Sequence, residues 1–343
     1  MEFDLMAGAR TWERSAATAT ELERAGFSGM LFTESAQVPW MMIAAAAMAA
    51  PSLHFSTGIA VAFPRSPMIS AQVAWELAMN TGGRFRLGLG SQVRGHVVRR
   101  YGAGFDKPAP RMRDYLQAVR ACLRAFRGEA ALEHDGPYYS LSLLPAQWSP
   151  PRHDHEDVKI DLAAVGPHMT RVAGELADGV HVHPMHSIPY LHNRLLPGLR
   201  EGAARAQRDP GELELIVPVF AIPGDTPEAR EPLIQRAKAQ IAFYGSTPNY
   251  AFQFEDLGYP DVPDKLYRSM KAGDIETMIA TIDDELLEHF AVIATWDDLA
   301  DALIARYHGT AARLVMYLAD ESIRRDAANL ERWGAIARAV RAA

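Results

Sequence analysis

One cysteine, Cys122, is present among the 343 residues of the chain, so no second thiol exists to pair with it. A single thiol excludes an intrachain disulfide and also excludes a metal site built from cysteines alone. An excess of positive charge is missing as well, because the formal net charge is −7 and the isoelectric point is about 6.0. These absences indicate a reducing compartment, the cytoplasm, and argue against a dedicated binder of nucleic acid or of membrane surfaces.

A long, uninterrupted apolar run is also lacking. The apolar stretch from Trp40 to Ala50 is stopped by Pro51 and is too short to span a bilayer. The first nine residues, MEFDLMAGA, lack the basic start and the apolar run of a secretory signal peptide. We therefore expect the stretch before Pro51 to form a buried helix, and we expect no membrane partner.

Short apolar runs alternate with helical patterns along the sequence, of which 48% is hydrophobic and 22% is charged. That composition is typical of a globular protein with a substantial core. The predicted strands are residues 3–7, 29–33, 53–62, 85–90, 160–165, 179–183, 213–222 and 314–318. The predicted helices are residues 12–25, 41–50, 67–80, 112–126, 167–177, 189–207 and 296–308, with a final helix after Asp320.

Eight strand–helix alternations without an internal repeat or a linker favour a closed parallel barrel. We therefore predict an α/β fold, a (β/α)8 TIM barrel, as one domain over residues 1–343. Residues 223–294 are mostly helical and are interrupted by YGSTPNY and LGYPDVPD, so they are predicted as an insertion or lid region after the seventh strand. An open, doubly wound sheet is the alternative, and the strand count favours the barrel.

In such barrels the functional residues lie in the loops that follow the strands. The glycine-rich loop Gly88–His96 fits neither a dinucleotide fingerprint nor a P-loop, because its third glycine is misplaced and a histidine stands where lysine is required. The loop Ala164–Met169 places glycine and then proline at the start of a helix. Free N–H groups and the positive helix end make it a natural phosphate cradle, with an ordinary strand-to-helix turn as the alternative.

His181 and His183 alternate on one predicted strand, so both imidazoles face the same side of it. Together with His153, Asp154 and His155 they raise the alternative of a metal-dependent hydrolase. Barrel hydrolases usually place such a pair on the first strand, whereas this pair falls on the sixth. We therefore predict no metal ligands and expect pocket-lining or core histidines.

Five segments together resemble the luciferase-like monooxygenase superfamily, and more narrowly its actinobacterial-type oxidoreductases that depend on coenzyme F420, a deazaflavin. These segments are GMLFTES, STGIAVAFPRSP, GGRFRLGLGSQVRGHVVRRYG, AAVGPHMTRVAGELADGV and IAFYGSTPNY. The resemblance covers essentially the whole chain, and GRFRLGLGSQVRGH is its most specific part. It implies a TIM-like barrel that holds the ring system of the cofactor at its C-terminal face.

The resemblance also implies which residues hold the cofactor. A cis peptide between Gly58 and Ile59 is expected to support the ring from behind, and the loop after the fourth strand is expected to reach the ring and its side chain. The loop after the fifth strand is expected to hold the cofactor phosphate. The implied cofactor-binding residues are Ser35, Gly58, Ile59, Ser91, Gln92, His96, Ala164, Val165, Gly166, His168 and Met169.

Glu34 and Trp40 are the implied catalytic residues. Glu34 is the best candidate for transferring a proton by its location, and the alternative is that its carboxylate orients the loop by hydrogen bonds. Ser35 and Val93 stand where related sugar-phosphate dehydrogenases have a histidine and a glutamate, so sugar-phosphate oxidation is not expected. Tyr244, Thr247 and Tyr250 either line a substrate pocket or pack a lid.

The sequence therefore predicts an F420-dependent oxidoreductase that transfers a hydride between the deazaflavin and a small organic substrate. Two alternatives stay open, a reduced-FMN-dependent monooxygenase and a non-catalytic deazaflavin-binding protein. The expected partners are the small-molecule substrate and a reductase that regenerates the reduced cofactor, without nucleic acid or membrane. A homo-oligomer is left open, and the substrate and the direction of hydride transfer are not specified.

Overall fold

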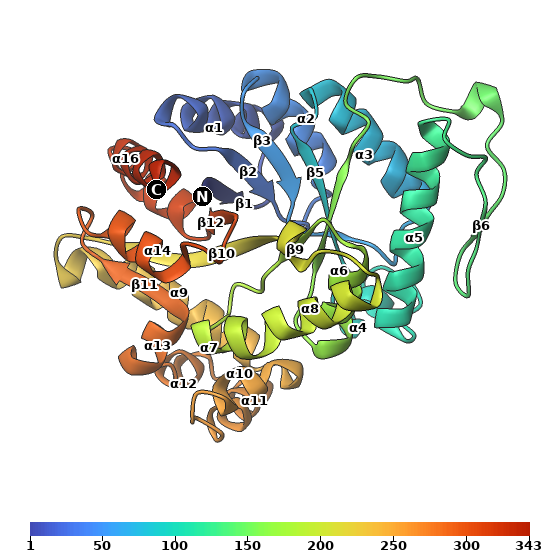
Figure 1. Cartoon of the computed structure of the whole chain (residues 1–343). Helices are drawn as coiled ribbons and strands as arrows, with labels where there is room; N and C mark the ends of the chain where they lie inside the picture. Colours follow the sequence, from blue (N-terminus) through green and yellow to red (C-terminus); the bar gives the residue numbers. More distant parts are fainter.

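A closed ring of eight parallel strand positions forms the centre of the protein (Figure 1), and the computed structural model describes all 343 residues. The strands of the ring are β1 (Glu2–Ala7), β2 (Gly29–Phe32), β3 (His54–Thr57) with β4 (Ala60–Val61), β5 (Phe85–Gly90), β8 (Lys159–Ala163), β9 (Gly179–His181), β10 (Glu214–Pro223) and β12 (Arg313–Met316). Their order is β10–β12–β1–β2–β3–β5–β8–β9, and β9 pairs with β10 to close the ring. The predicted (β/α)8 TIM barrel is confirmed.

Helices surround this ring, and local signals set many of their ends. They are α1 (Trp12–Ala25), α2 (Trp40–Ala49), α3 (Pro67–Thr81), α4 (Arg94–Arg99), α5 (Pro108–Phe126), α6 (Pro167–Leu176), α7 (Ile188–Tyr190), α8 (Leu196–Arg205), α14 (Leu299–Tyr307), α15 (Ala319–Arg325) and α16 (Asn329–Ala342). Helix α1 ends at Gly26 and α3 at Gly82, and both glycines adopt the left-handed conformation that favours glycine. Helix α3 begins at a proline, and the hydroxyl of Ser66 accepts a hydrogen bond from the N–H of Met68.

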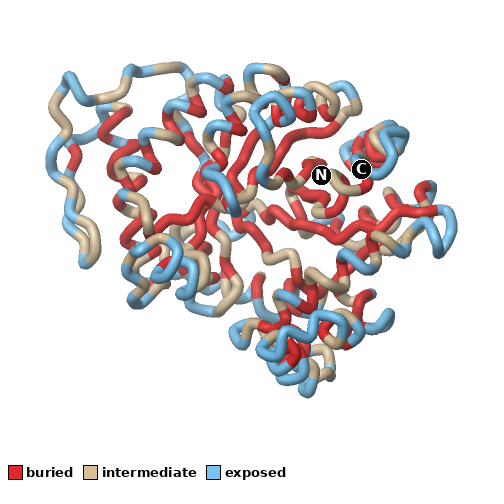
Figure 2. Tube along the Cα trace, turned by 180° about the vertical axis from the view of Figure 1, so that it is seen from behind, coloured by how far each residue is buried: buried red, intermediate tan, exposed pale blue.

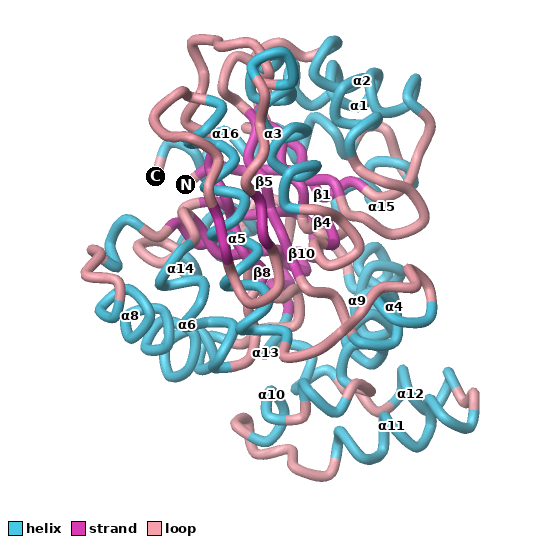
Figure 3. Tube along the Cα trace, turned by 90° about the vertical axis from the view of Figure 1, so that its right-hand side faces the viewer, coloured by secondary structure: helices cyan, strands magenta, loops and turns pink.

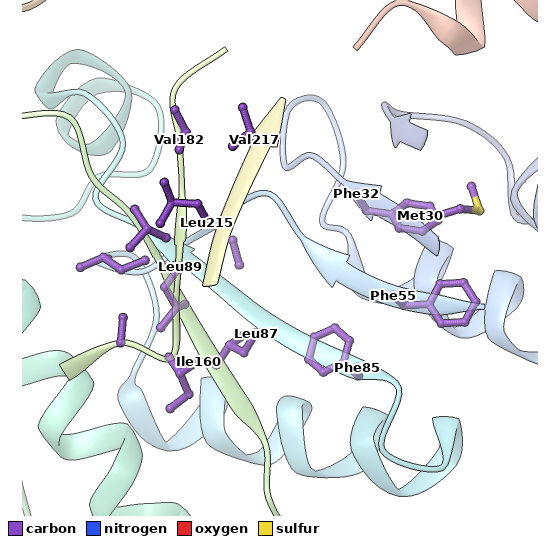
Figure 4. Packing of buried hydrophobic residues seen from close by; sticks show 14 of the residues in the cluster. Met30, Phe32, Phe55, Phe85, Leu87, Leu89, Ile160, Val182, Leu215 and Val217 are labelled. Carbon is purple, nitrogen blue, oxygen red and sulfur yellow. The ribbon is translucent and has the colours of Figure 1, made fainter. Parts of the chain in front are cut away.

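Side chains that point outward from the strands pack against the helices in one large apolar core. Figure 4 shows part of this core, with residues from β2, β3, β5, β8 and β10, and Figure 2 shows the buried strands at the centre of the trace. Successive residues of a strand point to opposite sides. On β5, Leu87 and Leu89 therefore join the core, whereas Arg86, Gly88 and Gly90 point into the ring.

The inward side chains in the N-terminal half of the barrel are charged and paired. Arg86 donates to Asp161 at 2.9 and 2.6 Å and to Glu214 at 2.7 Å. Arg313 donates to both carboxylate oxygens of Asp4, at 2.6 and 2.8 Å. Buried charges are tolerated where partners and hydrogen bonds satisfy them, so these two networks close the lower end of the barrel.

A small apolar layer lies above the charged networks. Leu31, Ile216 and Val315 form a separate buried cluster, and Met6 packs against it. These residues come from four neighbouring strands of the ring, and they separate the charged lower half from the C-terminal mouth. The mouth is the end at which barrels of this kind place their functional loops.

The third strand of the barrel is divided. The prediction of one strand over residues 53–62 is wrong in this detail, because β3 ends at Thr57 and β4 begins at Ala60. The peptide between Gly58 and Ile59 is cis, as expected from the resemblance. Both pieces still pair with β5, so the barrel stays continuous across the interruption.

Three short elements were missed in the sequence. Strand β11 (Ala291–Ala294) lies within the predicted insertion but pairs with residues 220–223 of β10, which extends beyond the ring. Helix α4 follows β5, and the ribbon of β6 (His134–Asp135) and β7 (Ser140–Leu141) lies in the long segment before β8. Each has only two to six residues, which is too short to produce a clear periodicity. The helix predicted at 189–207 is present, with a π-helical turn at Leu191–Leu195.

The helices between β10 and β11 lie beyond one end of the barrel (Figures 1 and 3). They are α9 (Pro227–Gly245), α10 (Phe252–Glu255), α11 (Val262–Ala272), α12 (Ile275–Ala280) and α13 (Asp284–Phe290). They bury a second apolar core that also includes Phe220 and Ile222 of β10. None of the helices in the protein combines the length and the apolar character needed to cross a membrane.

Two histidines on the segment after β8 are enclosed in the protein interior. His181 lies inside the barrel with its Nε2 atom 3.8 Å from Asp161 Oδ2, and His186 shares a hydrogen bond of 3.1 Å with the hydroxyl of Tyr307. Burial lowers the pKa of each of these imidazoles to about 4. Both rings are therefore neutral at neutral pH.

We expect acid to destabilise the protein through these histidines. An unfolded histidine binds a proton below its ordinary pKa of 6.5, whereas the buried rings stay neutral until about pH 4. The unfolded state then binds more protons across this window, so the free energy of unfolding falls as the pH falls from 6.5 to 4. Urea unfolding at neutral pH and at about pH 5 measures this slope. The variant His186→Gln should show a shallower slope, and an unchanged slope would contradict the assignment.

Gly88 is the position where the barrel tolerates no side chain. A Cβ atom there would lie 1.9 Å from the carbonyl oxygen of Thr57 and 2.4 Å from His181 Nε2. We expect Gly88→Ala to lower the free energy of unfolding by about 3 kcal/mol or to prevent folding, because the backbone oxygen cannot move aside. Gly95→Ala is the control, since a Cβ on that helical glycine meets nothing within 4 Å. Equal stability of the two variants would refute the assignment.

Candidate functional site

Small residues line the mouth of the barrel on the side of β3, β5 and β8. Gly58, Gly90 and Ala163 occupy inward positions where these strands end. A Cβ on Gly90 would lie 2.7 Å from Ile59 Cγ1, and one on Gly58 would lie 2.1 Å from the side chain of Leu31. The side chain of Ile59 therefore lies across Gly90. This side of the mouth presents backbone and one branched apolar side chain instead of bulky polar groups.

The loop after β5 turns sharply into helix α4. Gln92 adopts a positive φ of 58°, and its side-chain oxygen accepts a hydrogen bond of 3.0 Å from the N–H of Val93. The hydroxyl of Ser91 donates to the carbonyl oxygen of Gln92 at 3.2 Å. His96 lies on α4 and is exposed. The predicted residues Ser91, Gln92 and His96 therefore lie together at the mouth, next to Gly90.

The loop after β8 leads into the open N-terminus of α6. Gly166 is the residue before the helix, no side chain caps it, and a Cβ on it would meet nothing within 4 Å. The N–H groups of a first helical turn have no partner within the helix, so those of His168 and Met169 are available. The imidazole of His168 is exposed and lies 2.9 Å from the guanidinium of Arg171. The first turn is therefore open, rich in donors and close to a cation.

The rest of this loop is fixed by burial and by a hydrogen bond from Tyr190. Ala164 is buried, and the carbonyl oxygen of Val165 accepts a hydrogen bond of 3.0 Å from the hydroxyl of Tyr190. Tyr190 is itself fully enclosed. The predicted cofactor residues 164–169 therefore form one short segment that is exposed only at Pro167 and His168, where the helix begins.

Glu34 is buried, and its carboxylate accepts hydrogen bonds from two other segments, one after β3 and one after β5. Oε2 accepts from the backbone N–H of Val61 at 2.9 Å and from Arg65 Nη1 at 2.8 Å, and Oε1 accepts from Arg65 Nη2 at 2.6 Å. The hydroxyl of Tyr101 also donates to Oε1, at 3.3 Å. Burial, and then the Glu34 charge, raise the pKa of Tyr101, so this hydroxyl keeps its proton. The carboxylate thus ties together the loops after β2, β4 and β5.

Trp40 and Ser35 lie near this ion pair without joining it. The guanidinium of Arg65 stands 5.7 Å from the centre of the Trp40 ring, a cation–π arrangement. Ser35 is exposed, and its carbonyl oxygen accepts a hydrogen bond from Arg100. Ser35 therefore belongs to the loop that Glu34 fixes, and Trp40 begins the helix α2 that follows this loop.

A cluster of aromatic side chains covers the mouth at the end of β9. The ring of His183 lies 4.6 Å from that of Tyr244 and 4.5 Å from that of Tyr250, while the hydroxyls of Tyr244 and Tyr317 share a hydrogen bond of 2.9 Å. His183 Nδ1 accepts the N–H of Met185 at 3.1 Å, so the proton of the neutral ring is on Nε2. Burial lowers the pKa of His183 to about 4. The ring can therefore donate a hydrogen bond from Nε2 at neutral pH.

The histidines proposed as an alternative metal site are dispersed. His183 contacts tyrosines, whereas His153 packs against Trp75 at a ring separation of 4.5 Å. No group of three or more histidine, cysteine, aspartate or glutamate side chains is arranged to hold a metal ion. His181 is enclosed in the interior, as expected for a core histidine, whereas a pocket-lining position of His183 stays a prediction.

Sequence reasoning missed three residues that the structure places at the site. Arg65 and Tyr101 bind Glu34 from 31 and 67 positions away in the chain, and Tyr317 follows β12. The segment FPRSP contains Arg65, but no local pattern connects an arginine to a glutamate on another loop. Tyr244 and Tyr250, which are expected either to line a substrate pocket or to pack a lid, both contact His183.

Comparisons with known proteins agree with this architecture. The sequence pattern described as luciferase-like monooxygenase matches residues 2–314. An uncharacterized protein of Mycobacterium tuberculosis, Rv1360, is 37% identical over 302 residues, which cover 88% of this chain and 89% of the relative.

Solved structures of low sequence identity share the fold. The F420-dependent tetrahydromethanopterin reductase from Methanopyrus kandleri has a TM-score of 0.78 and 19% identity over 97% of each chain. An F420-dependent secondary alcohol dehydrogenase in complex with an F420–acetone adduct has a TM-score of 0.73 and 17% identity over 99% of this chain and 98% of the other. The oxygenating constituent of the 3,6-diketocamphane monooxygenase from Pseudomonas putida, in complex with FMN, has a TM-score of 0.66 and 17% identity, over 99% and 96% respectively.

The family match extends over nearly the whole length of the barrel, from β1 into β12. The relative from Mycobacterium tuberculosis is similar over almost its entire length as well. The chain belongs to the luciferase-like monooxygenase family.

Proposed function

We propose that this protein is an F420-dependent oxidoreductase that transfers a hydride between the deazaflavin and a small organic substrate. The observation that carries the proposal is the arrangement at the mouth, where Ile59 lies over the small residues of β5 and the open first turn of α6 stands beside them. A flat ring and a phosphate group fit these two features. Two structural neighbours are named as F420-dependent enzymes, which supports the same cofactor here.

The residues at the mouth could hold both the ring and the phosphate of such a cofactor. Gly58 and Ile59 would support the ring, and Ser91, Gln92 and His96 would reach its edge and side chain. The N–H groups of His168 and Met169, at an open helix N-terminus, would bind the phosphate, with Ala164, Val165 and Gly166 forming the approach to it. Arg171, whose guanidinium contacts His168, would add positive charge beside that phosphate.

The residues of the mouth would hold a deazaflavin, which would supply hydride chemistry there, since carbon replaces the nitrogen through which flavins react readily with oxygen. The chain itself positions the substrate and excludes water. Tyr244 and Tyr250 would form the wall of the substrate pocket, as part of the lid formed by residues 223–294. His183 would donate a hydrogen bond from Nε2 to a substrate oxygen, because only its Nδ1 is engaged by the protein.

Glu34 acts in this proposal as a positioning residue. Its two oxygens accept four hydrogen bonds from Val61, Arg65 and Tyr101, so the carboxylate is already saturated. This arrangement supports the alternative considered from the sequence, in which the carboxylate orients the loop. Trp40 then lines the mouth through its contact with Arg65.

A reduced-FMN-dependent monooxygenase is the second candidate, because the 3,6-diketocamphane monooxygenase shares the fold and holds FMN. A separate reductase would regenerate the reduced cofactor in either case. A protein that binds the deazaflavin without turnover is the remaining alternative. Cofactor binding followed by turnover on a carbonyl compound separates all three.

The first prediction from the proposed function concerns cofactor choice and the loop that would hold the phosphate. We expect equilibrium dialysis to show tighter binding of F420 than of FMN, and Gly166→Asp to weaken F420 binding at least about tenfold. The negative charge would stand where the phosphate lies, whereas aspartate is itself a good residue before a helix, so the fold should persist.

The matched control is Gly166→Ala, which adds a side chain without charge and without an oxygen that could cap the helix. We expect it to bind F420 within about threefold of the original protein, since a Cβ at this position meets nothing within 4 Å and the first N–H groups of the helix stay free. Tighter binding of FMN would replace the proposal by the monooxygenase. Unchanged affinity in a folded Gly166→Asp variant would remove this loop from the site.

The second prediction separates positioning from proton transfer at Glu34. Glu34→Gln and Arg65→Gln break the same buried ion pair from opposite sides, where the side chains are only 2% and 14% exposed. We expect each variant to lose about 3 kcal/mol of unfolding free energy, because one partner is left buried without its counter-charge. We also expect their turnover to fall by similar factors. Denaturant unfolding and steady-state kinetics measure the two quantities.

A proton-transfer role would give a different result. Glu34→Gln would then lose roughly 10²–10⁴-fold in turnover beyond the loss in Arg65→Gln. His183→Phe serves as the comparison for a residue that contacts substrate, since we expect it to lower turnover with unchanged F420 binding. A strong and selective loss in Glu34→Gln would return Glu34 to the catalytic group.

A further inference from the structure

A charged cleft opens at the mouth on the side of β1 and β12. Its volume is about 410 Å³, and its inner wall includes Met6, Thr33 and Tyr317, which follow or end the strands β1, β2 and β12. Tyr317 is hydrogen-bonded to Tyr244, which packs against His183. The cleft is therefore continuous with the aromatic wall of the proposed substrate pocket.

The cleft lies across the barrel from the proposed cofactor loops. In the closed ring of eight strand positions, β1 is four places from β8, and β12 is four places from β5. The loops after β5 and β8 are those assigned to the cofactor ring and phosphate. A molecule in the cleft would therefore approach the ring from the opposite side, where a substrate has to lie.

The lining of the cleft has more positive than negative charge. It contains four arginines, Arg10, Arg14, Arg236 and Arg324, and two acids, Asp320 and Glu321, so the formal balance is +2 (4 − 2). The whole chain has a formal net charge of −7. The net charge of the whole chain would predict a negative surface here. The positive charge of the cleft lining therefore indicates a role specific to this cleft.

The two acids of the cleft are already engaged by other groups. Arg10, whose side chain is only 9% exposed, binds Asp320 at 3.1 Å and also donates to the carbonyl oxygen of Gly8. Glu321 accepts a hydrogen bond of 2.8 Å from Arg325, which lies outside the cleft lining. Arg10 and Arg325 therefore neutralise most of the negative charge in the cleft.

The remaining arginines are exposed and loosely paired. The side chains of Arg14, Arg236 and Arg324 are 45%, 52% and 61% exposed, and their nearest carboxylate oxygens, on Glu21, Glu321 and Asp320, lie 3.8, 3.4 and 3.3 Å away. Exposed pairs of this kind contribute at most about 1 kcal/mol. Each guanidinium can therefore turn toward an anionic ligand at little cost, and arginine is well suited to bind carboxylate or phosphate.

We infer that this cleft binds an anionic group of the substrate, a carboxylate or a phosphate, and holds the reducible end of the molecule toward the barrel axis. This inference rests on the proposed function, and it narrows the substrate class to organic anions. Arg14 and Arg236 are the specificity-determining residues, since both line the cleft and come from two separate helices, α1 and α9.

The test uses the full chain, with and without F420, and combines a binding measurement with a kinetic comparison. Calorimetry measures the binding of inorganic phosphate, and kinetics with reduced F420 compare 4-oxopentanoate with its uncharged methyl ester. We expect the acid to have at least about a tenfold lower KM than the ester, because a charge-assisted hydrogen bond is made only with the acid. In the double variant Arg14→Gln/Arg236→Gln, this preference and phosphate binding should both fall about tenfold.

The control is Arg200→Gln, which removes the same charge from an exposed site on α8. It should leave phosphate binding and the preference for the acid unchanged. Absence of phosphate binding, equal binding in the double variant, or equal KM values for acid and ester would each overturn the inference. Loss of F420 affinity in the double variant would also overturn it, by assigning the cleft to the anionic tail of the cofactor.

A separate observation tests the proposed function itself. If the original protein does not bind F420, that function is lost. Phosphate binding without cofactor, and its dependence on Arg14 and Arg236, would still establish the cleft as an anion site.

Discussion

The inward face of the parallel barrel is the constraint on which the rest of the structure depends. Only alternate residues of eight strand positions reach the interior, so a few side chains decide what each level contains. At the lower level, Arg86 and Arg313 are paired with carboxylates, and at the middle level Leu31 and its neighbours exclude water. The mouth can be open because these two levels already close the barrel beneath it.

The Glu34 ion pair extends this constraint to the loops. Loops are usually the least fixed parts of a barrel, yet three of them meet here through one buried carboxylate and Arg65. Arg65 also donates to the carbonyl oxygen of Val61 at 2.6 Å, so the arginine binds both the carboxylate and the strand end that the carboxylate contacts. A site built on such a clamp keeps its geometry before any ligand arrives, which lowers the entropic cost of binding.

The sequence signals that predicted the fold lie within short segments. The features that the prediction missed depend on residues that are far apart in the chain. Helix α1 was located at both ends, because apolar spacing and Gly26 lie within one short segment. The barrel followed from counting alternations, which does not require exact strand ends. The cis peptide between β3 and β4 was expected only from the resemblance, and the division of the strand was not predicted, since an apolar run gives no sign of either. Strand β11 was missed because its role depends on the length of β10, which is fixed by distant pairing.

The same distinction explains the candidate site. Residues 164–169 form one continuous segment, so the sequence could bring them together without knowledge of the fold. The ion pair of Glu34 and Arg65, in contrast, joins two loops that only the closed ring brings into contact. The cationic cleft depends still more on the fold, because Arg14, Arg236 and Arg324 come from three separate helices. A closed barrel gathers residues from the whole chain at one mouth, so the proposed cofactor loops can be encoded in short motifs, whereas the proposed substrate cleft is encoded only in the assembled ring.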